Sequence, residues 1–390
     1  MSFATLALVV AAGLLGPVLA SLPRFGPPVI VGQIAAGVLI GASGFRWVDP
    51  TDPFLTGLAT IGFALLMFIV GTHLPVRDVQ LRAALAKGAL LTALVVLLAI
   101  AGGLVVSHLV AFHRPAILAV LLATSSGAVA LPVLQELGRS DRPALVATAW
   151  IAIADVGTVV ALPVVLATGA IGRVLLGGAL VILSGVALHT VARLLRHRRV
   201  VARVRGLSRD RGWGLDLRIS LLALFTCAWI ATRFGTSILI AGFTVGAVVA
   251  LLGEPRRVAQ QLVGIGEGFL VPLFFVHLGT QLDFAALIRS SDAVRLAALL
   301  ASLAIVIHVA AAAAGRLPVS MGLLATAQLG VPSAIVTLGL ASHQLTAAQA
   351  SAVMAAVLVS LAACAAGGVM AGHSGRLTDA SAPTLDAPAA

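Results

Sequence analysis

Asp155 is the side chain in this sequence with the clearest chemical potential. It lies in the middle of an apolar segment, residues 144–169, in which no other residue is charged. A carboxylate is costly at the depth of a lipid bilayer and usually marks a path for ions or protons. Thr124, Ser125 and Ser126 add hydroxyl oxygens in the preceding apolar segment. A desolvated carboxylic acid with several neutral oxygens can exchange a proton for a hard cation such as sodium.

A structural interpretation of Asp155 stays open beside this one. Hydroxyls or backbone groups could satisfy a buried carboxylate that has no further role. The chain contains only 14 acidic residues, and this scarcity favours a function for the one placed where charge costs most.

The composition indicates a polytopic membrane protein. Among 390 residues, 60% are hydrophobic and 10% are charged, whereas about 25% are charged in a soluble chain. The net charge of +11 comes from basic residues at segment ends and in one loop, which is typical of membrane topology rather than of nucleic-acid binding. Cys227 and Cys364 have no disulfide or zinc spacing. We expect no cofactor, and the absence of catalytic motifs predicts that the chain is not an enzyme.

Apolar stretches predict the fold class, an all-α polytopic membrane protein with about thirteen transmembrane helices. The loop after the seventh stretch is rich in arginine, and positive loops remain in the cytoplasm. We therefore expect a multi-pass protein of the cell (inner) membrane, with its N-terminus on the outer side and its C-terminus in the cytoplasm. The predicted spans are residues 3–21, 28–44, 54–73, 88–108, 115–136, 144–168, 172–195, 215–232, 236–252, 264–282, 293–314, 319–341 and 347–371.

Matching residues predict an internal repeat. The stretch from Gly62-Phe63 to Gly71-Thr72 resembles the one from Gly268-Phe269 to Gly279-Thr280. Gly37 and Gly41 similarly match Gly242 and Gly246, and Pro132 matches Pro332. All three pairs are separated by roughly 200 residues, which indicates one duplication. Because six spans and a connector separate the copies, the second copy is expected to run inverted, as in many secondary transporters.

The repeat sets the predicted domain boundaries. Residues 1–371 are expected to form the transmembrane domain, and Ser/Pro/Ala-rich residues 372–390 a disordered cytoplasmic tail. Within the domain, we expect repeat one at 1–169, a connector helix at 170–195, a basic cytoplasmic loop at 196–214 and repeat two at 215–371.

Two spans in matching positions carry signals of a broken helix. The fifth contains the run from Thr124 through Gly127 to Pro132, and the twelfth the run from Gln328 through Gly330 to Ser333. Each run joins small polar residues to glycine and proline, and proline removes a backbone hydrogen bond. Discontinuous helices of this kind place free backbone groups at the bilayer midplane in transporters. An ordinary proline kink is the alternative for either span alone.

At this point the sequence resembles the monovalent cation:proton antiporter superfamily, on the branch of bacterial Kef-type and NapA-like exchangers. The resemblance covers nearly all of residues 1–371 and is carried by the segments 28–43, 68–71 and 269–276 and by the Thr/Ser run that precedes Asp155. It implies a core domain with two crossed, unwound helices, a separate dimerisation panel, a homodimer and elevator-type alternating access. It also implies a transported sodium or potassium ion at Asp155, with Thr124, Ser125 and Ser126 as further ligands.

The sequence departs from this family at three charged positions. Relatives often carry a second acid or an Asn where this chain has Ala154, a lysine where it has His308, and an Arg-Gly-Glu-like motif where it has Leu329-Gly330-Val331. A buried lysine without its acid would be an unpaired charge, so the losses are mutually consistent. They predict one-for-one, electroneutral exchange through Asp155, although altered selectivity or lost transport would leave the same pattern.

Four other polar residues are candidates for modulating or lining the site. His308 could share or tune the proton of Asp155, since histidine titrates near neutrality, although it could equally be a neutral, structural histidine. Gln328 and Ser333 could line the cavity or bond between helices. Glu267 could attract cations at the inner end of the tenth span or be a solvated interfacial residue.

Two other functions remain open on the same scaffold. One is a channel-like potassium efflux pathway, and the other is a non-transporting membrane receptor or scaffold. A requirement for a proton counter-gradient would distinguish an antiporter from both.

Overall fold

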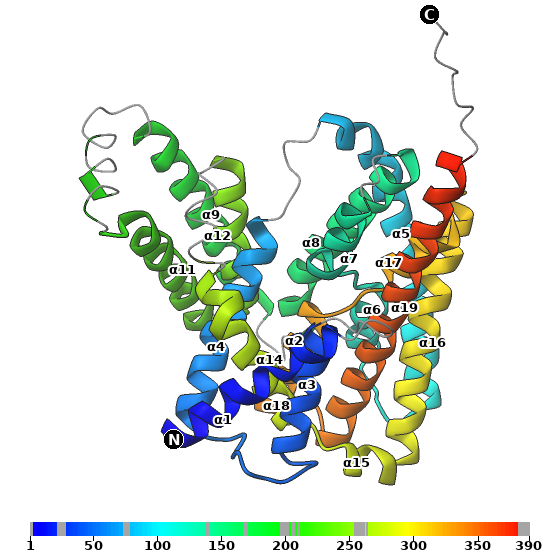
Figure 1. The fold of residues 1–390 in the computed structure, drawn as a ribbon, viewed down its shortest axis with the longest axis horizontal. Helices are drawn as coiled ribbons and strands as arrows, with labels where there is room; N and C mark the ends of the chain where they lie inside the picture. Colours follow the sequence, from blue (N-terminus) through cyan, green and yellow to red (C-terminus); the bar gives the residue numbers. More distant parts are fainter. Residues whose placement is uncertain are drawn as a thin grey trace, which may run out of the picture.

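The structure is a computed structural model that describes most of the chain. The residues described are 3–21, 29–72, 79–137, 141–166, 171–195, 203, 207–208, 211, 213–252, 262 and 264–380. Within these ranges the regular structure is helical, as the apolar segments predict, and contains no strand (Figure 1). Most of the predicted basic loop and the last ten residues of the predicted tail lie outside the described residues.

Two groups of helices make most of their contacts within themselves. In Figure 1, α9, α11 and α12 of the first group lie on the left, and α5, α16 and α19 of the second on the right. The first group, here called the panel, contains α1 (Phe3–Gly13), α2 (Leu15–Ala20), α3 (Val29–Ile40), α4 (Pro53–Thr72), α9 (Ile171–Leu195), α11 (Leu215–Arg233), α12 (Ile238–Leu252), the π-helix η1 (Gly266–Leu270) and α14 (Val271–Thr280).

The second group, here called the core bundle, carries the two spans predicted to be broken. Its main contacts with the panel are made by α8, which touches α9 and α12. The division agrees with the core and panel that the family resemblance implies. The core bundle contains α5 (Val79–Leu109), α6 (Pro115–Ala123), α7 (Gly127–Glu136), α8 (Arg142–Leu166), α15 (Phe284–Arg289), α16 (Ser291–Ala314), α17 (Val319–Ala325), α18 (Gly330–Ala341) and α19 (Ala347–Ala380).

The predicted spans all coincide with helices. Ten helical segments in the described part of the chain are long and apolar enough to cross a membrane, and α3 and α12 are apolar but shorter. The start of α1 and the end of α19 lie toward opposite edges of the view in Figure 1. The count of thirteen and the orientation of the termini stay predictions. Helix α19 continues to Ala380, past residue 371 where the membrane domain is predicted to end.

Glycines hold the panel helices at close range. A Cβ on Gly37 of α3 would lie 2.0 Å from the Val276 carbonyl oxygen of α14, and one on Gly246 of α12 would lie 2.1 Å from the Phe68 carbonyl oxygen of α4. Small residues at such positions let membrane helices approach backbone to backbone. Helices α3 and α4 belong to predicted repeat one, and α12 and α14 belong to predicted repeat two. Each of the two contacts therefore joins one repeat to the other. This is the pairing that an inverted repeat requires, although the repeat itself stays a prediction.

A single methyl group tests this packing. We expect Gly246→Ala to lower the thermal unfolding temperature in detergent, because the Cβ meets backbone atoms that can move only with the whole helix. Gly178→Ala on α9 is the matched control, since its Cβ would meet no atom within 4 Å and alanine is the better helix former. Equal unfolding temperatures for the two variants would contradict the close packing of α12 on α4.

Candidate functional site

The fifth span is interrupted at Thr124–Ser126, where the chain leaves the helix between α6 and α7. Thr124 is extended, with φ −69° and ψ 133°, and its hydroxyl donates to the Val120 carbonyl at 2.7 Å. This bond satisfies one of the carbonyls that the end of α6 leaves without a helical partner. The Ser125 hydroxyl donates to the carbonyl of Ala325 in the other broken span.

The twelfth span is interrupted in the same way between α17 and α18, and the two breaks bond to each other. The Ser126 N–H donates to the Ala327 carbonyl at 2.6 Å. In the opposite direction, the Gln328 side-chain amide donates to the Leu121 carbonyl at 2.8 Å. These bonds satisfy backbone groups that would be costly to leave unpaired in a bilayer. The crossed, discontinuous helices expected from the sequence are therefore present.

Proline does not mark where either helix breaks. Pro132 lies inside α7, several residues after its start at Gly127. Pro332 lies in the first turn of α18, a position where a missing N–H costs little. The sequence prediction of two broken spans is correct, and the first break lies on the Thr/Ser run that the sequence singled out, whereas the second ends at Gly330 rather than extending to Pro332. Short polar runs end α6 and α17 instead.

The carboxylate of Asp155 reaches the first break from α8. Its side chain is buried, with 8% of its surface exposed, and its Oδ2 accepts a hydrogen bond from the Gly127 N–H at 2.9 Å. Gly127 is the first residue of α7, so the carboxylate lies at a helix N-terminus, where free N–H groups and the helix dipole favour negative charge. A Cβ at Gly127 would lie 3.0 Å from Oδ2, so glycine permits this approach.

Within the described residues, the Gly127 N–H is the one hydrogen-bond partner of the Asp155 carboxylate. Among the described residues, Asp155 forms no ion pair, and the preceding residue is the apolar Ala154. Ser126, the neighbour of Gly127, is buried, and its hydroxyl makes no hydrogen bond to the described part of the chain. One turn along α8, the Thr158 hydroxyl donates to the carbonyls of Ala154 at 2.8 Å and Asp155 at 3.1 Å.

His308 contacts the first break but not Asp155. Its ring is fully buried on α16, and Nδ1 lies 2.8 Å from the Ala304 carbonyl. Because a carbonyl only accepts, Nδ1 carries a proton. Nε2 lies 3.5 Å from the Ser125 hydroxyl, and the ring stacks on Trp150 with centroids 5.7 Å apart. Within the described residues, no hydrogen bond joins His308 to Asp155, and the ring meets α8 at Trp150 instead.

The remaining predicted site residues lie in two places: two of them at the breaks and one in the panel. Gln328 bonds across the breaks, and Ser333 in the first turn of α18 is fully buried with an Oγ that has no hydrogen-bond partner among the described residues. Glu267 is an exposed residue of the π-helix η1, which packs against α4 in the panel. It is therefore not part of the crossing. Sequence reasoning missed Gly127 and Thr158 as site residues, although a glycine that follows Ser-Ser signals a helix start.

A family model described as "Sodium/hydrogen exchanger, transmembrane" matches residues 8–370 of the chain. Over 392 aligned residues, the chain is 26% identical to YjbQ of Bacillus subtilis, which is named as a candidate Na+/H+ antiporter. The match covers 92% of this chain and 62% of that protein. GerN of Bacillus cereus, named as a Na+/H+-K+ antiporter, is 25% identical over 67% of both chains.

A third relative shows how much longer some of these proteins are. KefC of Escherichia coli, named as a glutathione-regulated potassium-efflux system protein, is 27% identical over 68% of this chain and 43% of its own length. The chain thus spans less than two thirds of both YjbQ and KefC.

A solved structure shares the fold. The sodium/proton antiporter MjNhaP1 of Methanocaldococcus jannaschii aligns with a TM-score of 0.68 over 95% of this chain and 97% of that one, at 13% identity. The exchanger family model spans nearly the whole transmembrane region. The chain therefore belongs to the transmembrane sodium/hydrogen exchanger family.

Proposed function

We propose that this protein exchanges a monovalent cation, sodium or potassium, for a proton across the membrane, with Asp155 as the shared site. The observation that carries the proposal is the buried Asp155 carboxylate bonded to the Gly127 N–H at the crossing of two broken helices. Membership of the exchanger family and the names of the relatives support the same reaction.

Charge explains why one carboxylate is sufficient for coupled exchange. An ionised, empty Asp155 would carry a negative charge through a medium of low dielectric constant, at high cost. A bound proton removes that charge, and a bound monovalent cation balances it. Both loaded forms of the site are neutral and inexpensive to move, whereas the empty form is not. Each transport cycle therefore carries one cation one way and one proton the other.

The break beside Gly127 supplies hydroxyl oxygens of the kind that a hard cation prefers. Ser126 contributes a hydroxyl that is not engaged by the described residues. Thr124 and Ser125 donate their hydrogens to carbonyls, but a hydroxyl oxygen that donates keeps its lone pairs for a cation. These three residues with Asp155 form the ligand set of the proposal. The Gly127 N–H stabilises the ionised carboxylate that the cation needs.

The separation of core bundle and panel supports an elevator-type movement. The breaks and Asp155 all belong to the core bundle, and the main contacts of this bundle with the panel are limited to those of α8. A rigid core that slides against the panel would carry the site from one side to the other without unfolding the crossing. A homodimer assembled through the panel, in a cell (inner) membrane with an outer N-terminus and a cytoplasmic C-terminus, completes the proposal.

Neutralising Asp155 is the direct test. We expect Asp155→Asn to reduce cation-driven proton flux in proteoliposomes to the level of protein-free liposomes, because an amide neither releases a proton nor balances a cation. Flux is measured with a pH-sensitive dye after addition of sodium or of potassium. Asp292→Asn is the matched control, because Asp292 is half-exposed at the start of α16. Unchanged exchange in Asp155→Asn would exclude this carboxylate as the carrier.

Membrane potential tests the predicted stoichiometry. If both loaded forms are neutral, changing the membrane potential from 0 to about −100 mV with the sodium, potassium and proton gradients held constant should leave the initial rate of sodium-driven exchange unchanged. Moving one net charge would be worth about 2.3 kcal/mol per 100 mV, which is about a fiftyfold bias. Exchange that itself generates a potential would show that the cycle is electrogenic.

The Ser126 hydroxyl tests the ligand set. Ser126→Ala is expected to raise the apparent KM for the cation about tenfold, because one oxygen ligand is lost while the proton site at Asp155 is kept. The maximal rate should change less than the KM. Ser302→Ala on the exposed surface of α16 provides the control for loss of a serine hydroxyl. An unchanged KM in Ser126→Ala would remove this side chain from the site.

A further inference from the structure

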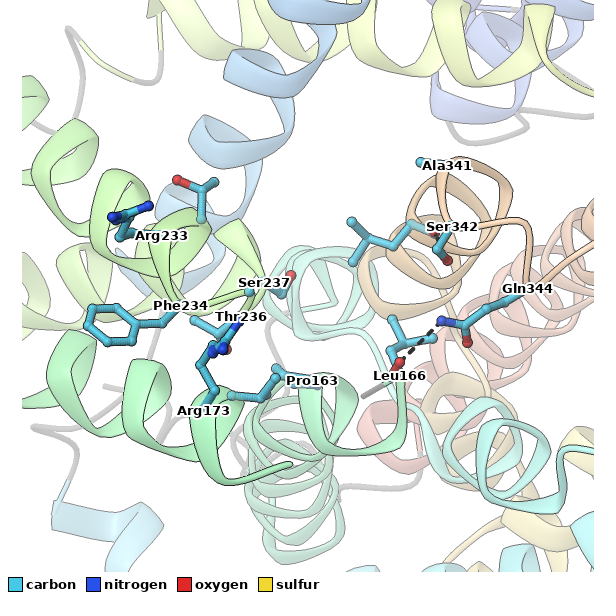
Figure 2. Close-up of a pocket in the computed structure, with 14 residues that line it drawn as sticks. Pro163, Leu166, Arg173, Arg233, Phe234, Thr236, Ser237, Ala341, Ser342 and Gln344 are labelled. Carbon is cyan, nitrogen blue, oxygen red and sulfur yellow. Dashed lines mark hydrogen bonds between the residues drawn. The ribbon is translucent and has the colours of Figure 1, made fainter. Parts of the chain in front are cut away.

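A cavity of about 570 Å³ lies where the core bundle meets the panel, away from Asp155. Pro163 and Leu166 of α8 line one side together with the C-terminal end of α18. Arg173 of α9 and Arg233 of α11 line the panel side, and Figure 2 shows them across the opening from Leu166 and Gln344. The proposed cation site does not use any of these residues.

The two arginines give the cavity an unbalanced positive charge. No carboxylate lines it in the described part of the chain, and neither guanidinium forms an ion pair with a described residue. Arg173 is also the third residue of α9, where the positive end of the helix dipole adds to its charge rather than offsetting it. The start of α12 directly follows the cavity residues Thr236 and Ser237. The field in the cavity therefore favours an anion.

Hydrogen-bond donors in the cavity lack acceptors. Thr236 is 6% exposed, and its Oγ1 is buried with no hydrogen-bond partner among the described residues. The Ser237 oxygen accepts from the Leu239 N–H at 3.2 Å, which leaves its hydroxyl hydrogen to donate. A buried hydroxyl without a partner is uncommon in native structures. Together with two guanidinium groups, these hydroxyls are suited to several oxygens of one ligand.

The geometry of the guanidinium groups and the size of the cavity limit which chemical class of ligand can bind there. Arginine pairs with phosphate through two parallel N–H···O bonds. A cavity of this volume is in the range that holds molecules larger than a single ion, and Val174, Phe234 and Leu338 add an apolar lining. We infer that this cavity binds a phosphate-bearing anion through Arg173, Arg233 and Thr236. An anionic phospholipid headgroup and free phosphate share this chemistry.

A ligand bound in this cavity would also affect transport, and this effect rests on the proposed function. The ligand would contact helices of both the core bundle and the panel, so it would resist their relative movement. Exchange should therefore slow when the cavity is filled. Binding itself does not depend on exchange, so the two inferences can fail separately.

Binding is tested by the thermal unfolding of the whole purified chain in detergent. One arm compares short-chain phosphatidylglycerol with short-chain phosphatidylcholine, and the other compares inorganic phosphate with chloride at equal ionic strength. A ligand that binds the folded state raises the unfolding temperature with its concentration. Stabilisation by phosphatidylglycerol alone identifies a lipid headgroup, and stabilisation by phosphate as well identifies the phosphate group as sufficient.

Variants test whether the rise in unfolding temperature comes from binding in the cavity. Arg173→Gln with Arg233→Gln should weaken the apparent affinity about tenfold or more, whereas Arg46→Gln with Arg289→Gln removes the same charge from exposed positions elsewhere and should not. Leu338→Trp fills the cavity without a change in charge and should also abolish stabilisation. If neither probe stabilises the wild-type chain more than its control, or if the Arg173/Arg233 variant responds as the wild type does, the inference is overturned.

Discussion

Every described feature of the site depends on the hydrogen bonds by which two interrupted helices pair each other's free backbone groups inside a membrane. A helix that stops in hydrocarbon leaves N–H and C=O groups without water to bind. Here each break supplies the missing partners of the other, through the Ser126 N–H to the Ala327 carbonyl and the Gln328 amide to the Leu121 carbonyl. Neither interruption could persist alone at this depth. The crossing is therefore one cooperative unit, although its halves lie about 200 residues apart in the chain.

The placement of Asp155 follows from that unit. Because α6 stops at Ala123, α7 begins at Gly127 and presents a free N–H inside the core bundle. The Asp155 carboxylate accepts from this N–H, so an ionised acid has a partner without a neighbouring cation. The family resemblance implies a lysine and a second polar residue in this region, whereas this chain has His308 and Ala154. The ring of His308 is held by Ala304 and Trp150, and the Gly127 N–H is the partner of the carboxylate in the described part of the chain.

The two helix groups are held together in different ways. The glycines of α3 and α12 bring the panel helices into backbone contact, which favours a stiff slab. The core bundle is held by its cross-bonded breaks, and the main contacts between the groups are those of α8. This division is what an elevator-type exchanger would need, because a carrier domain must move without disturbing its own site. The arginine-lined cavity between the groups is a place where a ligand could act on that movement.

The sequence by itself determined the membrane class, the positions of the spans, the two spans that break and the solitary acid. These properties are local: hydropathy marks a span, short polar runs with glycine end a helix, and a lone charge in an apolar segment stands out. Only the tertiary structure decided that the second break precedes Gly330, that Gly127 supplies the partner of Asp155, and that Glu267 lies in the panel. Those outcomes depend on which polar atoms of distant segments meet. Hydropathy and spacing carry no information about that, because it is decided by the packing of whole helices.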